Sequence, residues 1–380
     1  MSKKIPLISG TTSLLNRLGF VEALRGLAAL YVVAYHVALI PVPSLSVPLW
    51  ANKIILAGGT GVSLFFIVSA FTLTMSMRLR SNEPHPVLGF YTRRIFRIVP
   101  LFYAWIIITW LRDRVWFGVT QSLSTVLLSM SFSYNLIPGK ETGFVWAGWT
   151  LGVEMLFYLM FPLIYSYADD MWKALAFFLA TLTLSSIFSY LVTSYLHMDA
   201  AAISSFLSFS IFQQLPIFAF GIFVYYVYEE FIQNKSLPVS WGICLVLLSI
   251  FGYSALLDGR LQALMGGFQW HAVIYGTLLL GLSIFPLGVF VNRLTSFYGE
   301  ISYSLYLNHP TLVFALVPAY RFVYNLPLPL TIKYGVCFLL TIALLTILSY
   351  GTYRLIEKPG MRLGSNLVKK FMPAHPSVSK

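Results

Sequence analysis

Apolar residues run along most of this chain in stretches long enough to cross a lipid bilayer. A spanning helix needs about 20 mostly apolar residues, because every backbone amide in hydrocarbon must find its partner within its own segment. The pattern predicts an all-α polytopic membrane protein with about ten transmembrane helices, near 22–41, 54–77, 97–111, 149–168, 172–196, 203–228, 237–257, 271–291, 298–319 and 331–353.

The stretch 119–137 departs from this pattern. It begins with apolar residues but ends in Ser131, Ser133 and Asn135, and a helix exposed to lipid does not tolerate such a polar end. We therefore predict a partial or re-entrant helix in this stretch.

The composition agrees with a membrane protein. Hydrophobic residues make up 58% of the 380 residues and charged residues only 10%, with a mean hydropathy of +0.78, whereas a soluble domain carries about a quarter charged residues. Cys244 and Cys337 both lie in apolar runs, which favours neither a disulfide framework nor a cysteine-based zinc site. Metal-binding histidine spacings and a phosphate-binding loop are also absent from the sequence. We predict no bound metal, no bound cofactor and no nucleic-acid partner.

Basic residues are distributed unevenly between the loops. Lys and Arg number 25 against 13 Asp and Glu, and most of them fall on the side of the N-terminus. Because cytoplasmic loops carry an excess of Lys and Arg, we predict that both termini are cytoplasmic. The expected organisation is a cytoplasmic N-terminal segment 1–21, one integral membrane domain 22–357 and a cytoplasmic tail 358–380.

Two polar residues interrupt the first predicted span. Arg25 and His36 lie eleven positions apart, which on a helix is three turns plus about 20°, so they share one face at an axial separation of about 16 Å. A buried charge costs several kcal/mol without partners or water, which favours a polar cavity along that face. The alternative is that Arg25 snorkels to the interface while His36 bonds to a neighbouring helix.

A second polar cluster precedes the third span. Arg93, Arg94 and Arg97 lie on the predicted cytoplasmic side, and Arg94 and Arg97 are three positions apart, so their guanidinium groups can point together. Planar, bidentate donors suit phosphate groups. Membrane topology alone would also place basic residues here, although lysines would serve that purpose equally well.

The remaining candidates come from two later spans. Glu154 lies inside the fourth span and needs a cation or a proton; it can pair with Arg25 or His36, stay neutral, or join two helices structurally. Ser302, Tyr306 and His309 form one polar stripe. Alternatively, His309 satisfies a backbone turn loosened by the following proline.

The chain resembles the acyltransferase-3 family of integral membrane O-acyltransferases. Arg25 and His36 match its pattern of a basic residue, ten intervening residues and a histidine. Four further segments resemble family motifs in the expected order: GGTGVSLFFIVSAFTLT, RRIFRIVPLFY, GWTLGVEMLFYLMFP and GEISYSLYLNHP. Ser63 and Ala70 depart from the second-helix motif, where an acidic residue and a glycine are usual.

This resemblance implies a reaction and roles for the polar residues. The family transfers acetyl or other acyl groups from acyl-CoA to a hydroxyl group, often of a cell-surface or lipid-linked carbohydrate. By this resemblance His36 is the general base, aided by Arg25 and Glu154, and the coenzyme A phosphates lie near Arg93, Arg94 and Arg97. Trp149, Ser302, Tyr306 and His309 would line the acceptor cavity. The expected site of action is the bacterial cytoplasmic membrane, alone or beside glycan export or assembly machinery.

Other functions and routes stay open at this point. A proton-coupled transporter or exporter would use Arg25, His36 and Glu154 as a proton relay, and a non-catalytic membrane sensor is a third alternative. The acyl group can be acetyl, succinyl or longer. The acceptor can be a glycan, a lipid-linked sugar or a small exported metabolite. Transfer can be direct or pass through an acyl-His36 intermediate.

Overall fold

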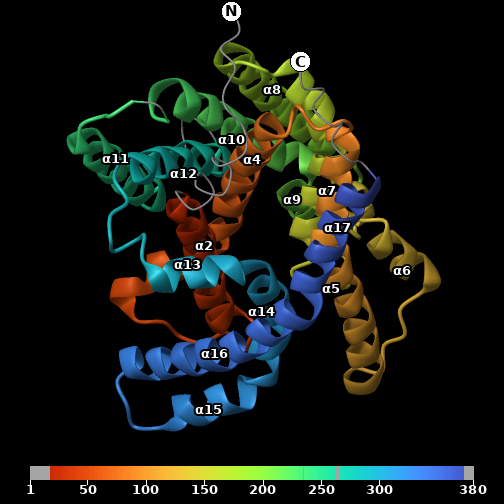
Figure 1. Cartoon of the computed structure of the whole chain (residues 1–380). Helices are drawn as coiled ribbons and strands as arrows, with labels where there is room; N and C mark the ends of the chain where they lie inside the picture. The colour runs from red at the N-terminus through yellow and green to blue at the C-terminus, as the bar shows by residue number, and fades with distance from the viewer. Residues whose placement is uncertain (1–17, 234, 262–265, 372–380) are drawn as a thin grey trace, which may run out of the picture.

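The computed structural model describes residues 18–233, 235–261 and 266–371, and no strand occurs within these ranges. Residues 1–17 of the predicted N-terminal segment and 372–380 of the predicted tail lie outside them. The helical elements, which Figure 1 shows, are α2 (Gly19–Leu39), η1 (Leu49–Ala51), α3 (Asn52–Leu56), η2 (Gly58–Thr60), α4 (Gly61–Leu79), α5 (Pro86–Trp116), α6 (Leu123–Met130), η3 (Tyr134–Leu136), α7 (Trp149–Tyr167), α8 (Met171–Tyr195), α9 (Ala200–Phe209), α10 (Ile211–Phe231), α11 (Val239–Leu257), α12 (Gly267–Ile284), α13 (Arg293–Glu300), α14 (Ser302–Ala315), α15 (Val317–Asn325), α16 (Leu330–Thr352), η4 (Tyr353–Glu357) and α17 (Lys358–Phe371).

This architecture confirms an all-α polytopic membrane protein. Among the described residues, eight helical segments are long and apolar enough to cross a membrane. The other two predicted spans correspond to α12, which has 18 residues, and to the region of α13 and α14. The predicted count of ten and the predicted orientation of the termini therefore stay predictions.

Three predicted spans are interrupted rather than continuous. The span 54–77 breaks at η2, where Gly58 lies so close to α2 that a Cβ atom would come within 2.4 Å of the Tyr31 carbonyl oxygen. The span 203–228 breaks at Ser210, whose hydroxyl caps α10 by accepting from the Phe212 amide. The span 298–319 breaks at Ile301 and Leu316. Hydropathy detects none of these breaks, because each lies within an apolar run.

Two other regions differ in length from their predicted helices. The third predicted span, 97–111, is the central part of the 31-residue helix α5, which also contains the arginine cluster. The polar-ended stretch 119–137 contains the eight-residue helix α6 and the 3-10 turn η3. Figure 1 shows α6 at the periphery of the bundle, beyond α5.

Helix α2 runs through the middle of the molecule and contacts α4, α13 and α14 (Figure 1). Its residues belong to both hydrophobic clusters of the core, with Ala28 in one and Ala29 in the other. Small residues allow the close approach: a Cβ atom on Gly26 would lie 2.0 Å from the Thr295 carbonyl oxygen of α13, and one on Gly299 would lie 1.9 Å from that of Glu22. This packing holds the polar face of α2 at the centre of the bundle.

Helix α17 packs against α5 (Figure 1). Gly360 and Gly364 contact Phe96, where an added Cβ atom on either glycine would come within 2.6 Å. The described part of the predicted tail 358–380 is therefore a packed helix, and it supports α5 along the turns that carry the arginine cluster.

Candidate active site

Three cavities lie in series along the polar face of α2. The arginine cavity, of about 80 Å³, is lined by Arg25, Ser69, Arg94, Arg97, Glu154 and Ser302 among others. The mixed-charge cavity, of about 620 Å³, is lined by three arginines and three glutamates, namely Arg25, Arg97, Arg293, Glu22, Glu300 and Glu357. The aromatic chamber, of about 1070 Å³, is lined by Tyr35, His36, Trp146, Trp149, Phe209 and Phe268 among others.

Shared wall residues establish the order of the three cavities. Arg25 and Arg97 line both the mixed-charge cavity and the arginine cavity. Val62 and Tyr306 line both the arginine cavity and the aromatic chamber. The narrow arginine cavity therefore connects two wider spaces.

The polar face of α2 extends along this series. Arg25 borders the two charged cavities and His36, eleven residues later, borders the aromatic chamber. Polar cavities therefore lie along this face, and Arg25 lines two of them. Its one ion pair within the described residues is with Glu22, at 3.7 Å.

Three guanidinium groups converge on the arginine cavity with few partners. Within the described residues, Arg94 and Arg97 form no hydrogen bond and no ion pair closer than 4.0 Å; Arg94 lies over the rings of Phe90 and Tyr158, at 5.9 and 5.8 Å from their centroids. Ser302 is fully buried and its hydroxyl also lacks a protein partner. Donors held this way in a confined space suit an anionic or carbonyl-bearing ligand.

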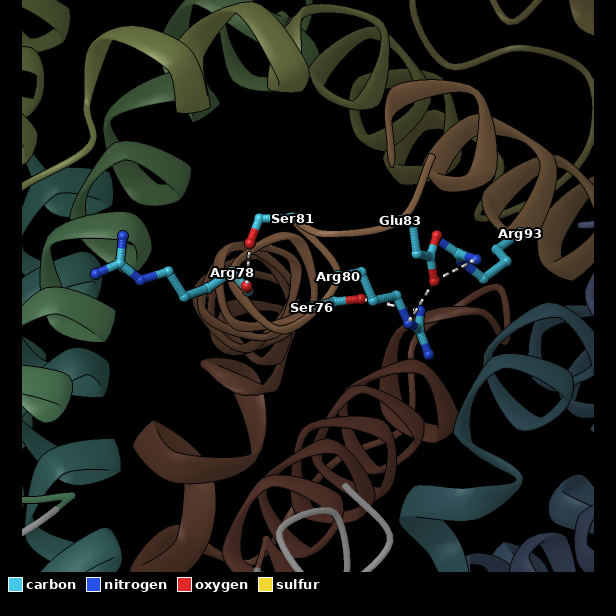
Figure 2. A network of polar contacts seen from close by, with 6 residues as sticks. All are labelled: Ser76, Arg78, Arg80, Ser81, Glu83 and Arg93. Atoms are coloured by element: carbon cyan, nitrogen blue, oxygen red, sulfur yellow. Dashed lines mark hydrogen bonds and ion pairs between the residues drawn. The ribbon is translucent and has the colours of Figure 1, made fainter. Parts of the chain in front are cut away.

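Arg93 does not join the other two arginines of its cluster. Its guanidinium donates to Glu83 at 2.7 Å, and the same carboxylate lies 3.7 Å from Arg80, which donates to Ser76 at 3.1 Å. Figure 2 shows this network, with Glu83 between the two arginines at the connection from α4 to α5. Neighbouring residues on a helix point about 100° apart, so Arg93 and Arg94 serve different faces of α5.

Glu154 lies in the arginine cavity but is not paired with a cation. Its carboxylate accepts hydrogen bonds from Ser69, at 2.7 Å, and from Tyr158. Of the alternatives considered for this residue, an ion pair with Arg25 or His36 is not formed among the described residues: both hydroxyls bond to Oε1, and His36 lies in the next cavity. Glu154 lies opposite the three arginines that line the same cavity.

His36 contacts the buried imidazole of His309. His309 Nδ1 lies 2.5 Å from the Tyr306 carbonyl oxygen, and its Nε2 lies 3.1 Å from His36 Nδ1, which is also 2.9 Å from the Val32 carbonyl oxygen. Carbonyl oxygens only accept, so both Nδ1 atoms carry a proton. His309 Nε2 then accepts from His36 Nδ1–H, and His36 Nε2 keeps its lone pair without a protein partner, on a ring that lines the aromatic chamber.

The stripe on α14 divides between the cavities. Ser302 faces the arginine cavity, Tyr306 lies at the junction, and His309 stands behind His36. The alternative role of His309, satisfying a loosened backbone turn, is also present, since it donates to Tyr306. Trp149 lines the aromatic chamber beside Phe209, with ring centroids 4.6 Å apart.

Sequence reasoning missed several polar residues of these cavities. Tyr158 stands four residues after Glu154, a spacing that predicts contact on a helix. Arg112 and Asp113 form a buried ion pair at 2.7 Å beside the aromatic chamber, with Arg112 3.9 Å from the Trp146 ring centroid. His271 lines the same chamber. The sequence signal for Arg112 and Asp113 was a charged pair near a helix end. Such a pair is also typical of a solvated loop.

Metal binding receives no support from the described residues. No group of three or more histidine, cysteine, aspartate or glutamate side chains gathers there in a way that could hold an ion.

Comparison with known proteins identifies the family. The sequence model of the Acyltransferase domain family matches residues 18–350, which is most of the chain. The chain belongs to the acyltransferase-3 family. Of the cavity-lining residues named above, all except Glu357 fall within the matched region of this family.

Several curated proteins are similar to this family member. The O-acetyltransferase OatA of Staphylococcus aureus (strain NCTC 8325 / PS 47) is 23% identical over 381 residues, covering 90% of this chain and 57% of that protein. The putative acetyltransferase ORF330 of Acidianus two-tailed virus is 25% identical over 76% of this chain and 81% of its own length. The exopolysaccharide production protein ExoZ of Rhizobium meliloti is 25% identical, with coverages of 81% and 90%. No solved structure matches the chain.

The match to OatA leaves part of that relative uncovered. The chain spans 57% of the length of the OatA proteins it matches. The match therefore supports membership of the family and covers only part of each OatA protein. The activity of a whole OatA protein is therefore a property of OatA and is not assigned to this chain by the match.

Proposed function

We propose that this protein is a membrane O-acyltransferase that moves an acyl group, acetyl in the first instance, from acyl-CoA to a hydroxyl group of a carbohydrate. The observation that carries the proposal is the series of cavities, in which a narrow cavity lined by arginines shares Val62 and Tyr306 with the chamber that His36 lines. Family membership and the names of the acetyltransferase relatives support the reaction class.

The donor would enter through the mixed-charge cavity. Three arginines and three glutamates balance each other there, so that cavity does not by itself select a polyanion. The arginine cavity has three guanidinium groups against the single carboxylate of Glu154, and this excess suits the diphosphate of coenzyme A. Arg94 and Arg97 are the best placed to bind it, since no protein carboxylate competes for them at close range.

The acyl end of the donor would reach the junction of the arginine cavity and the aromatic chamber. Arg25 and His36 are separated by about 16 Å along the helix axis, which the extended pantetheine arm can span. The arginine cavity, of about 80 Å³, would hold the diphosphate and the start of the linear arm, while the nucleoside would stay in the wider mixed-charge cavity. Donor and acceptor would then meet at Tyr306, which lines both spaces.

His36 would act as the general base. Its unprotonated Nε2 takes the proton of the acceptor hydroxyl, the oxygen attacks the thioester carbonyl, and the carbon–sulfur bond breaks. The coenzyme A thiolate leaves and takes up that proton from the imidazolium. In a route through acyl-His36 the same nitrogen attacks first. Either route requires the tautomer that the hydrogen bond to His309 selects.

Location follows from the chemistry and the basic residues of the loops. Acyl-CoA is a cytoplasmic metabolite, so the mixed-charge cavity would open to the cytoplasm and the aromatic chamber to the outside of a bacterial cytoplasmic membrane. Acceptors delivered by glycan export or assembly machinery would then reach the chamber from outside. This orientation agrees with the predicted cytoplasmic termini.

The proposal is tested with purified protein in detergent. We expect transfer of labelled acetyl from acetyl-CoA to a glycan acceptor without any membrane gradient. A transporter using the same residues would need a sealed membrane and would leave no covalent product. Mass spectrometry of surface glycans from cells with and without the gene should show an alkali-labile mass difference of one acetyl group. Absence of both products would refute the proposed reaction.

A further inference from the structure

One side chain of the aromatic chamber has hydrogen-bonding capacity that nothing in the proposed mechanism uses. Gln214 on α10 is only 1% exposed, and it lines the chamber that contains His36. Its Nε2 donates to the Ser208 carbonyl oxygen at 2.7 Å, which orients the amide. Its Oε1 is buried and has no protein partner.

The preceding residue provides an internal comparison. Gln213 is also buried, but its Oε1 accepts from Ser185 at 2.9 Å and its Nε2 donates to the Ser185 carbonyl oxygen at 3.0 Å. The two adjacent amides therefore differ: Gln213 is satisfied by α8, while Gln214, in the chamber wall, keeps a buried acceptor with no partner among the described residues. Buried acceptors in native proteins are nearly always paired, so an unpaired one beside a cavity points to a ligand that donates a hydrogen bond.

The surroundings of Gln214 indicate the class of that ligand. Trp149 and Phe209 line the same chamber with ring centroids 4.6 Å apart, and His271 has a buried Nδ1 without a protein partner. Aromatic faces beside a few unpaired polar atoms suit a ring that has both C–H faces and hydroxyl groups. An apolar alcohol would bury the Gln214 oxygen without compensating it.

We propose that Gln214 Oε1 accepts a hydrogen bond from a non-reacting hydroxyl of a sugar ring bound in the aromatic chamber, and that this bond selects polyhydroxylated acceptors over apolar alcohols. This inference rests on the proposed function for the reacting hydroxyl, which is presented to His36. It assigns a specificity role to a residue on α10, outside the segments that carry the family resemblance.

The experiment compares acceptors and variants in matched pairs. The probes are the methyl pyranosides of glucose, galactose and mannose, their monodeoxy analogues, and 1-octanol, each with labelled acetyl-CoA and the purified full chain. For the wild type we expect at least one pyranoside to exceed octanol in kcat/KM. Removal of one particular hydroxyl should lower kcat/KM by roughly 10-fold or more, because a site built to bond a hydroxyl rejects the analogue that lacks it.

Gln214→Met then identifies the amide as the partner of that hydroxyl. We expect this variant to raise the KM for the pyranoside more than the KM for acetyl-CoA, and to lose the discrimination against the same deoxy analogue. Gln213→Met is the control of equal bulk: it removes satisfied bonds to Ser185, so it should lower the thermal midpoint while keeping the discrimination. Equal deoxy discrimination in wild type and Gln214→Met would overturn the inference.

Two further measurements keep the inference testable if a variant fails to fold or if the proposed reaction does not occur. Wild-type protein that accepts octanol as well as every pyranoside, with no deoxy effect, overturns the inference without any variant. Calorimetric titration with the pyranosides in the absence of acetyl-CoA measures binding alone. Binding that depends on one hydroxyl, without any transfer, supports the inference and refutes the proposed function. If no pyranoside shows either binding or transfer, the inference is overturned.

Discussion

The arginine cavity and the aromatic chamber are neighbours that share Tyr306, yet they are built differently. The arginine cavity is lined entirely by residues of the helices α2, α4, α5, α7 and α14, and it carries three arginines and a glutamate among hydroxyl groups. The aromatic chamber is lined largely by loops and helix ends, such as 142–147 and 208–209, and its polar groups are mostly neutral. Helix interiors hold charged groups at defined spacing, whereas loops can vary while the helices stay in place.

This difference suits two substrates with different demands. If the donor is acyl-CoA, as proposed, a donor shared across the family would need the same phosphate contacts in each member, and rigid helices would supply them. Acceptors differ among enzymes, and loop residues can be replaced without disturbing the core. We therefore expect substitutions in the arginine cavity to act on the donor and substitutions in the aromatic chamber to act on the acceptor, with His36 at the boundary affecting both.

The largest effect is expected at that boundary. His36→Ala removes the general base and should lower kcat by roughly 100- to 10,000-fold, while the protein remains folded because only one partly buried side chain is lost. Initial rates of labelled acetyl transfer measure the loss. His85→Ala, on the connection between α4 and α5, serves as the control. Near-normal activity in His36→Ala would remove this residue from the mechanism.

Two neighbouring arginines, Arg93 and Arg94, test which residues bind the donor. Arg94→Met or Arg97→Met should raise the KM for acyl-CoA roughly 10- to 100-fold, since a charged hydrogen bond is worth about 1.5–3 kcal/mol. Arg93→Met should leave that KM unchanged, because Arg93 is occupied by Glu83 (Figure 2). Both constants are measured for each variant. A donor effect of Arg93→Met as large as that of Arg94→Met would contradict the assignment.

His309 provides a test of positioning rather than of binding. His309→Leu removes one of the two acceptors for His36 Nδ1–H and leaves only the Val32 carbonyl oxygen. The imidazole is then held less firmly, and kcat should fall roughly 10- to 100-fold, as loss of an orienting partner does at other imidazole sites. KM for both substrates should hardly change. His309→Gln retains an acceptor oxygen and should recover part of the rate. A purely structural role predicts that both variants lose thermal stability and activity in parallel.

The smallest effect is expected for a conservative change at Arg25. Arg25→Lys keeps the charge between the mixed-charge and arginine cavities and should lower kcat/KM for acyl-CoA only a few-fold, whereas Arg25→Met should lower it further. Labelling of a cysteine placed in the N-terminal segment reports whether each variant inserts correctly. An Arg25→Met protein that is correctly inserted and fully active would show that the donor does not use this charge.

The sequence by itself determined the class of protein and the polar face of its first helix. Apolar runs of about 20 residues leave few alternatives to a helical bundle in lipid, and eleven residues between Arg25 and His36 place both on one face of any straight helix. The placement of Arg94 and Arg97 along one cavity agrees with their spacing of three residues on a helix. Such features can be read from the sequence because helical periodicity is a property of the sequence alone.

Only the tertiary structure decided which side chains meet across helices. Ser69 donates to Glu154, and Arg93 donates to Glu83, because packing brings α4 beside α7 and the α4–α5 connection beside α5. Gln213 and Gln214 are identical in sequence, and their different environments arise from α8 covering one of them. Hydrogen bonds between distant residues depend on sub-ångström placement of whole helices, and that placement results from the packing of the entire bundle rather than from any local pattern.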